Sequence, residues 1–262
     1  MEIHKPKPWH GWREFLKEYA IIVVGVLTAL AAEQAVEAAH WIERVDTAEA
    51  RMRRELGEDY AFALERSMVT HCLDRRLTTL KAALLSGEGQ WKPLPPMHSR
   101  ALGEKAYFVP SRYYGDQVWK GVETDGTAGH IPPSVSALYG RAYSAAVAVS
   151  ADAADEFMAV ATFNLLNNPT RLPLPQRLDL ISRIEQEQVR NTLAEIRSRQ
   201  LMFKVKATTR IDDAKAQAWV LRISNTYQAC AELGLLDANA PSPQLASDPT
   251  AAANELPDVT LR

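Results

Sequence analysis

The sequence predicts an all-α protein in which a single N-terminal transmembrane helix runs into an extracytoplasmic helical bundle. Three observations lead to this fold class. A run of uncharged residues near the N-terminus continues in helical phase into the rest of the chain. The prolines cluster at a few points and leave long proline-free tracts, as the interiors of helices require. Only residues 203–209 alternate briefly like a strand, and they lack a partner strand.

The composition indicates a chain that mostly folds and does not bind nucleic acid. Of the 262 residues, 47% are hydrophobic and 24% are charged, which is ordinary for a globular protein of one or two domains. The 30 basic residues are balanced by 32 acidic ones. Because a nucleic-acid binder needs a strongly basic face, this balance argues against nucleic acid as a partner.

The first element is the uncharged run of residues 19–32, which lies between Glu18 and Glu33. Its 14 residues fall short of the length of about 20 that a membrane-spanning helix usually needs. Three interpretations are therefore open. The run is a retained transmembrane anchor, a cleaved signal peptide, or the first core helix of a soluble protein.

The signal-peptide interpretation has support and difficulties. Residues 29–31 read Ala-Leu-Ala, which is the A-x-A form of a cleavage site. However, the apolar helical pattern continues beyond this site as far as Trp41. No proline occurs between Pro8 and Pro93 to interrupt it. The uninterrupted pattern favours a segment that is retained.

The flanks of the run favour a membrane anchor over residues 19–41, with the lipid bilayer as a partner. Trp9 and Trp12 precede the run and Trp41 follows it, and amphipathic aromatics prefer the headgroup level of a membrane. A helix from Trp12 to Trp41 rises about 44 Å, close to the ~40–45 Å of a bilayer with its interfaces. Lys17 can extend its charge to the interface along its aliphatic stem.

The basic residues predict the orientation of the anchor. The leader, residues 1–18, holds four Lys or Arg, whereas the 18 residues after the run hold only Arg44. Because Lys and Arg accumulate on the cytoplasmic side, the leader is expected in the cytoplasm and the main domain outside it. In a bacterium this means the inner membrane, with the domain in the periplasm.

One face of the predicted anchor carries small residues. Gly25, Ala29, Ala32 and Val36 follow one another at spacings of three and four residues. Small residues let helices approach closely in lipid, so this face predicts packing against another membrane protein or against a second copy. The alternative is that small residues are simply common in anchors.

The prolines divide the domain predicted for residues 42–236 into helical tracts. Residues 88–111 are expected to form a loop. The tail, residues 237–262, contains four prolines and few large apolar groups, and is expected to be disordered. Helices are expected from the anchor to about Ser86, over about 112–122, over about 133–166, over about 175–206, and from a capping box of Thr209 and Asp212 to Gly234.

Two cysteines, Cys72 and Cys230, are present, and each lies in a predicted helix with an apolar stripe. In an oxidising compartment they are expected to form a disulfide between the first and last helices of the domain. The alternative is two separate buried thiols, since free cysteine is often a small core residue.

No motif assigns a reaction. The sequence lacks the HExxH, GxSxG, P-loop, CxxC and EF-hand patterns, so no catalytic residue, metal ligand or cofactor is assigned. The glycine-rich segment 121–130 is the remaining candidate pocket, with Trp119 before it and Glu123, Asp125 and His130 within it. Loops often carry function, although glycines here serve equally well to make turns.

The stretch WREFLKEYAIIVVGVLTALAAEQAVE, about residues 12–40, resembles the N-terminal anchor of a group of uncharacterised proteobacterial single-pass membrane proteins. In that group an F-x-x-E motif and an apolar run of the form I-V-V-x-G-V-L-x-A-L precede a helical domain. The rest of the likeness is one of layout, through Trp119, Gly121, Tyr139 and Tyr143. The resemblance implies a topology and carries no activity.

Together these patterns favour a non-catalytic, membrane-anchored helical protein that acts through protein–protein contacts, for example as an accessory or assembly subunit of an inner-membrane complex. An extracytoplasmic sensor is the first alternative, and its short leader would require a membrane partner to pass on a signal. The second alternative is an enzyme with an unrecognised helical site around Glu123, Asp125 and His130.

Overall fold

The structure is a computed structural model that describes residues 11–87, 89–244, 246–248, 252 and 259–260. It divides into two compact units, residues 1–47 and residues 48–262. Helices make up most of the described chain, which confirms the all-α class. One long apolar N-terminal helix is followed by a helical domain.

The elements follow one another in chain order. The helices are α1 (Trp12–Ser86), α2 (Gln117–Thr124), the 3-10 helix η1 (Thr127–His130), α3 (Pro133–Val160), the 3-10 helix η2 (Ala161–Asn167), α4 (Leu174–Thr208), α5 (Asp213–Ile223) and α6 (Asn225–Glu232). The strands are short: β1 (Gln90–Trp91) pairs antiparallel with β4 (Thr170–Arg171), and β2 (Met97–Ser99) with β3 (Gly103–Lys105).

The first unit consists, in its described part, of α1 from Trp12 to Thr47. Among the described residues, α1 is the one helix that is long and apolar enough to cross a membrane. None of its most apolar 18-residue window is buried inside the structure. This exposure disfavours the interpretation of the segment as a soluble core helix, because a core helix buries its apolar side chains.

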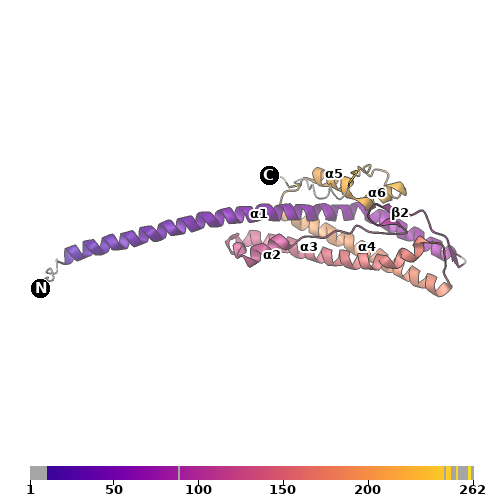
Figure 1. Cartoon of the computed structure of the whole chain (residues 1–262), viewed down its shortest axis with the longest axis horizontal. Coiled ribbons are helices and arrows are strands. Elements are labelled where there is room, and N and C mark those ends of the chain that lie inside the picture. The colour runs from indigo at the N-terminus through magenta and orange to yellow at the C-terminus, as the bar shows by residue number, and fades with distance from the viewer. Residues whose placement is uncertain (1–10, 88, 245, 249–251, 253–258, 261–262) are drawn as a thin grey trace, which may run out of the picture. The chain divides into compact units, whose positions relative to one another are not determined.

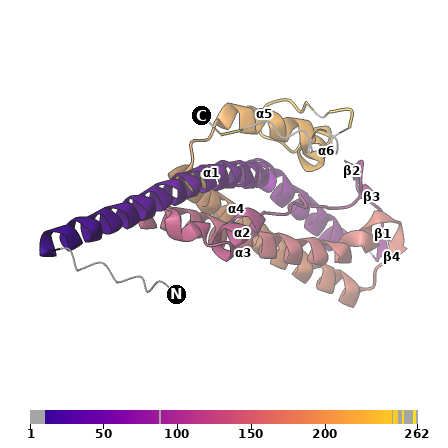
Figure 2. The same cartoon turned by 60° about the vertical axis from the view of Figure 1, so that its left-hand side comes forward.

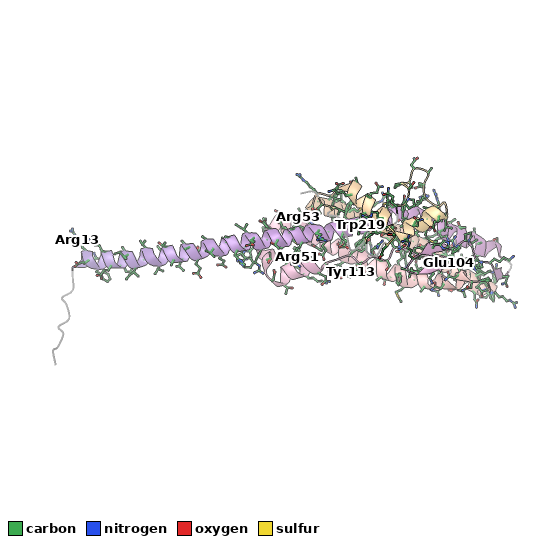
Figure 3. The ribbon with its side chains drawn as sticks, turned by 45° about the horizontal axis from the view of Figure 1, so that its top comes forward. Arg13, Arg51, Arg53, Glu104, Tyr113 and Trp219 are labelled. Carbon is green, nitrogen blue, oxygen red and sulfur yellow. A yellow bond between two sulfur atoms is a disulfide. The ribbon has the colours of Figure 1, made fainter. Side chains whose placement is uncertain are left out.

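The second unit is built in three layers around α1 from Ala48 onward (Figures 1 and 2). Helices α5 and α6 lie on one side of this part of α1, and the hairpin of α3 and α4 lies on the other. On the first side, the rings of Phe62 and Trp219 lie 5.5 Å apart (Trp219 is labelled in Figure 3). On the second side, Arg66 reaches Glu156 of α3 and Asn191 of α4.

The central position of α1 explains why this helix is buried on more than one face. Leu73, Leu77, Leu80 and Leu84 follow a spacing of three and four residues and are fully buried. They belong to a core cluster that also contains aromatic residues from the segments between the helices, namely Trp91, Tyr107, Phe108 and Phe163. The segment between α1 and α2 therefore covers the end of the core.

The predicted loop at 88–111 is partly wrong, because β1, β2 and β3 lie within it. The indole Nε1 of Trp91 in β1 donates a hydrogen bond to the carbonyl of Leu166 at 2.9 Å. The amide of Ala106 donates to Oδ1 of Asn167 at 2.7 Å. These bonds join residues that are 61 and 75 positions apart, which local periodicity does not reveal.

The last predicted helix is divided in two at Ser224. The Ser224 hydroxyl accepts a hydrogen bond from the amide of Tyr227 at 3.0 Å, so this residue is the N-cap of α6. The predicted capping box is also shifted. Asp212 itself caps α5, through its Oδ1 and the amide of Lys215 at 3.1 Å, whereas Thr209 ends α4.

Described residues of the tail differ from the expectation of disorder. The amide of Asp212 donates to the carbonyl of Val259 at 2.8 Å, and Trp219 Nε1 donates to the carbonyl of Ala252 at 3.3 Å. Val259 and Ala252 are buried. Val259 packs over Gly57 of α1, where a Cβ atom would lie 2.8 Å from its side chain. A glycine in α1 thus makes room for an apolar residue from the other end of the chain.

A disulfide joins Cys72 of α1 to Cys230 of α6, which is the pair that the sequence analysis expects. The two Cα atoms are 5.9 Å apart, within the ordinary range for a bridge. Both residues are buried in the core cluster. The bridge ties the layer of α5 and α6 to the central helix.

Replacing both cysteines, Cys72→Ala with Cys230→Ala, is expected to lower the free energy of unfolding of the domain by about 2–5 kcal/mol, because the bridge closes a long loop in the unfolded chain. Urea unfolding followed by tryptophan fluorescence measures this change. Equal unfolding midpoints for the variant and the oxidised protein would contradict it, as would free thiols that titrate in the native protein.

Candidate functional site

The apolar part of α1 exposes side chains that water solvates poorly. The predicted packing face lies on this helix, with Gly25, Ala29, Ala32 and Val36 all exposed. Val36 is 71% exposed, and a Cβ atom added to Gly25 would meet nothing within 4 Å. Large exposed apolar surfaces usually mark contact with a membrane or with another protein. The face is therefore available to a helix that approaches closely.

Aromatic residues gather at the first turns of α1, the end of the helix that Arg13 marks in Figure 3. The rings of Trp12 and Phe15 stack with centroids 5.9 Å apart, and those of Phe15 and Tyr19 at 6.3 Å. Lys17 lies exposed in the same turns. The sequence analysis identified Trp12 and Lys17 and missed the other two rings, although their three- and four-residue spacing was visible. The predicted interface residue Trp9 lies outside the described residues.

The other end of the anchor also carries an aromatic and a cation. The guanidinium of Arg44 lies 4.8 Å from the centroid of the Trp41 ring. Trp41 Nε1 donates to Oε1 of Glu37 at 3.5 Å. Within the anchor, the hydroxyl of Thr28 donates to the carbonyl of Val24 at 2.7 Å, so this polar group is satisfied by the helix itself.

The candidate pocket residues differ in burial and in the contacts that they make. Trp119 of α2 stacks with Tyr143 of α3 at 5.7 Å between centroids and thus joins the packing between these helices. Asp125 Oδ1 accepts a hydrogen bond from the amide of Thr127 at 2.9 Å. Glu123 and His130 are exposed. The contact of Asp125 belongs to a turn within residues 121–130.

The structure also bears on metal binding. Within the described part of the chain, no group of three or more His, Cys, Asp or Glu side chains is arranged to hold a metal ion.

A buried ionic network, which the sequence analysis missed, joins α1 to α3 and α4. Nη2 of Arg66 donates to Oε1 of Glu156 at 2.6 Å and to Oδ1 of Asn191 at 2.7 Å. Asn191 Nδ2 in turn donates to the carbonyl of Thr70 at 3.0 Å. All of these residues are buried. Removal of a single partner from such a network leaves an uncompensated buried charge, which is strongly destabilising.

A second buried carboxyl, Glu187 of α4, completes this network. Burial, followed by the negative charge of Glu156, raises its pKa to about 7. The positive charge of Arg190 only partly opposes this rise. Burial likewise raises the pKa of Glu156, against the opposing effect of Arg66. Oε1 of Glu187, Nε and Nη1 of Arg66 and the hydroxyl of Tyr107 are buried without a hydrogen-bond partner in the structure. The network is therefore under-satisfied and holds a proton near neutral pH.

Neighbouring carboxylates of α1 hold the segment before α2. Glu65 makes a two-pronged contact with Arg112, at 2.6 Å to Nε and 3.1 Å to Nη2. Asp59 accepts from the amide of Gly115 at 2.9 Å, and burial holds its pKa well above the usual value. Glu55 accepts from the amide of Gln117 at the start of α2, where a negative charge is favoured. These contacts are structural and position α2 against α1.

Comparisons with protein-family models, with curated proteins and with solved structures find no match for this chain. The exposed apolar helix and the buried carboxyl pair are thus the two features from which function is argued.

The domain is expected to become less stable as pH rises from about 5 to about 8. Glu187 has a pKa of about 7 in the folded protein and 4.5 as its ordinary value, so the folded state binds more protons between these values. Glu187→Gln is expected to flatten this dependence and to exceed the unmodified protein in stability at pH 8. Urea unfolding at a series of pH values measures the effect.

Glu185→Gln is the matched control, since it removes an exposed carboxylate from the same helix. It is expected to leave the slope between pH 5 and pH 8 unchanged. Parallel pH profiles for the unmodified protein and the Glu187 variant would contradict the assignment of the proton to this network.

Proposed function

We propose that this protein is a non-catalytic, single-pass protein of the bacterial inner membrane that acts through contacts with other membrane proteins, as an accessory or assembly subunit of a larger complex. Its helical domain lies in the periplasm. The observation that carries the proposal is the uncharged helical segment of residues 19–32, none of which is buried inside the structure and which needs lipid or protein around it.

Two features support the interpretation that this segment is retained in the mature protein: the tryptophans at its two ends and its continuity with the rest of α1. Trp12 and Trp41 bracket it at a separation that suits a bilayer with its interfaces. Helix α1 continues past residues 29–31, the candidate signal-peptide cleavage site, without a break. A signal peptide would end near this site, and the domain would begin with a new element.

The periplasmic location is supported by two independent features. Basic residues are concentrated in the leader, before the anchor, which favours a cytoplasmic N-terminus. The bridge between Cys72 and Cys230 joins the central helix α1 to α6. Disulfides persist in oxidising compartments such as the periplasm and are rare in the cytosol.

One observation favours a second candidate function, an extracytoplasmic sensor. The carboxyl pair of Glu156 and Glu187 lies where three helices meet, and Glu187 has a pKa of about 7. A change of protonation there would alter the packing of α3 and α4 on α1. In this candidate function the signal would pass through a membrane partner.

Protease treatment of spheroplasts tests the orientation. The proposal expects the domain after residue 41 to be digested from outside the cell, while an epitope placed before residue 12 is protected until the membrane is lysed. Protection of the domain in intact spheroplasts would contradict the periplasmic location.

Photo-crosslinking in native membranes tests the packing face of the anchor. A photoreactive residue at position 29 is expected to give a defined crosslinked product, since Ala29 lies on the small-residue face. The same residue at position 27, on the opposite side of the helix, is the matched control and is expected to give much less. Equal yields at both positions, or no product at either, would contradict the proposed contact.

A further inference from the structure

One face of α4 exposes apolar side chains in the pattern of a coiled-coil seam. The seam consists of Val189, Leu193, Ile196 and Phe203, which are 61%, 47%, 46% and 77% exposed. Their spacings are four, three and seven residues, and Gln200 occupies the position between the last two. Alternation of three and four residues along one helix is the signature of knobs-into-holes packing with a second helix.

The seam is separate from the core of the domain. The opposite face of α4 is already buried, through residues that include Ile184, Leu201 and Val205. A helix at the surface of a globular domain usually needs one apolar stripe, with polar residues on the other side. Helix α4 carries a second stripe that nothing in the described chain covers.

Basic residues border the seam. Arg183, Arg190, Arg197 and Lys204 recur every seven residues along one side of it, and Arg199 and Lys206 lie on the other. Several are paired within the domain, namely Arg183 with Asp179, Arg190 with Glu187, Arg197 with Asp152, Arg199 with Glu195 and Lys206 with Asp213. Although Arg183, Arg190 and Arg197 form these ion pairs, more than two fifths of each side chain remains exposed.

We propose that the α4 seam docks an amphipathic helix of a partner protein, with apolar residues at its own seam positions and Glu or Asp beside them. The proposal deepens the proposed function and rests on it, since it names a surface of the domain through which a protein contact is made. Charge complementarity selects an acidic partner: charged residues beside a coiled-coil seam set partner choice and orientation.

The same charges disfavour a second copy of the chain. In an antiparallel pair of α4 helices, the row of Arg183, Arg190, Arg197 and Lys204 would face its own copy. In a parallel pair, Arg199 would face Lys204 of the second copy. Like charges at these positions cost stability. A lipid surface is disfavoured because a strict seam of two positions per heptad is narrower than the apolar face of a membrane-surface helix.

A synthetic peptide tests the proposal directly. The probe has about four heptads, with Leu and Ile at the seam positions and Glu at the flanking positions; the reference peptide has Lys in place of Glu. Binding of fluorescent peptide to the full chain in phosphatidylcholine nanodiscs is followed by anisotropy. The acidic peptide is expected to bind at least about tenfold more tightly than the basic one. Its affinity is expected to fall as the salt concentration is raised.

Ile196→Asp in the seam is expected to weaken binding of the acidic peptide at least about tenfold. Val147→Asp is the matched control, because Val147 lies on α3 and is similarly exposed at 47%, and it is expected to leave the affinity unchanged. Circular dichroism of both variants shows whether the domain is folded. If Ile196→Asp does not fold, the exposed-charge variant Lys204→Glu takes its place, with weaker binding of the acidic peptide expected.

Three results would overturn the proposal: equal binding of the acidic and basic peptides, equal affinity of the seam variant and the unmodified protein, or seam-dependent binding to phosphatidylglycerol vesicles without binding to the peptide. The last result would assign the face to lipid. Anchor crosslinking from position 29 is independent of α4. Loss of peptide binding with crosslinking intact therefore rejects the seam alone, whereas loss of crosslinking rejects the anchor contact.

Discussion

The apolar surface of the N-terminal part of α1 is the constraint on which the account depends. From Trp12 to Val36 its large apolar side chains are exposed, except for the half-buried Val23. Each exposed side chain loses roughly 1.5–3 kcal/mol relative to burial when water surrounds it. No isolated helix in water recovers this free energy. A bilayer does, and it also accepts the aromatic rings at the two ends of the segment. The proposed membrane anchor rests on this requirement, whereas the proposed orientation rests on the basic residues that precede the segment.

In the helical domain, by contrast, contacts between buried polar side chains determine which helices of neighbouring layers pack together. Helix α1 is apolar enough at Leu73, Leu77 and Leu80 to hold a core, yet Arg66 lies buried in the same helix. Buried ion pairs add little net stability compared with apolar residues, but they specify which helices meet and in which register. The contacts of Arg66 with α3 and α4 serve this purpose, and the disulfide serves it for α6.

The parts that could be predicted from sequence are those that local patterns encode. Helix periodicity and proline placement predicted the class and most helices. The pairing of Cys72 with Cys230 was expected because both lie in predicted helices with an apolar stripe, in a domain expected in an oxidising compartment. The network around Arg66 was missed because its partners are 90 and 125 residues away. The contacts of the described tail residues were missed for a related reason, because docking of Val259 on Gly57 leaves no local signal. At residues 121–130 a turn and a pocket use the same residue types, so the sequence alone does not distinguish them.

The most direct test of the central claim is the mass of the protein in the membrane fraction after an alkaline carbonate wash. The account predicts a chain whose mass includes residues 19–41 and which stays in the pellet. A shorter chain that begins near residue 32 and is found in the soluble fraction would contradict it.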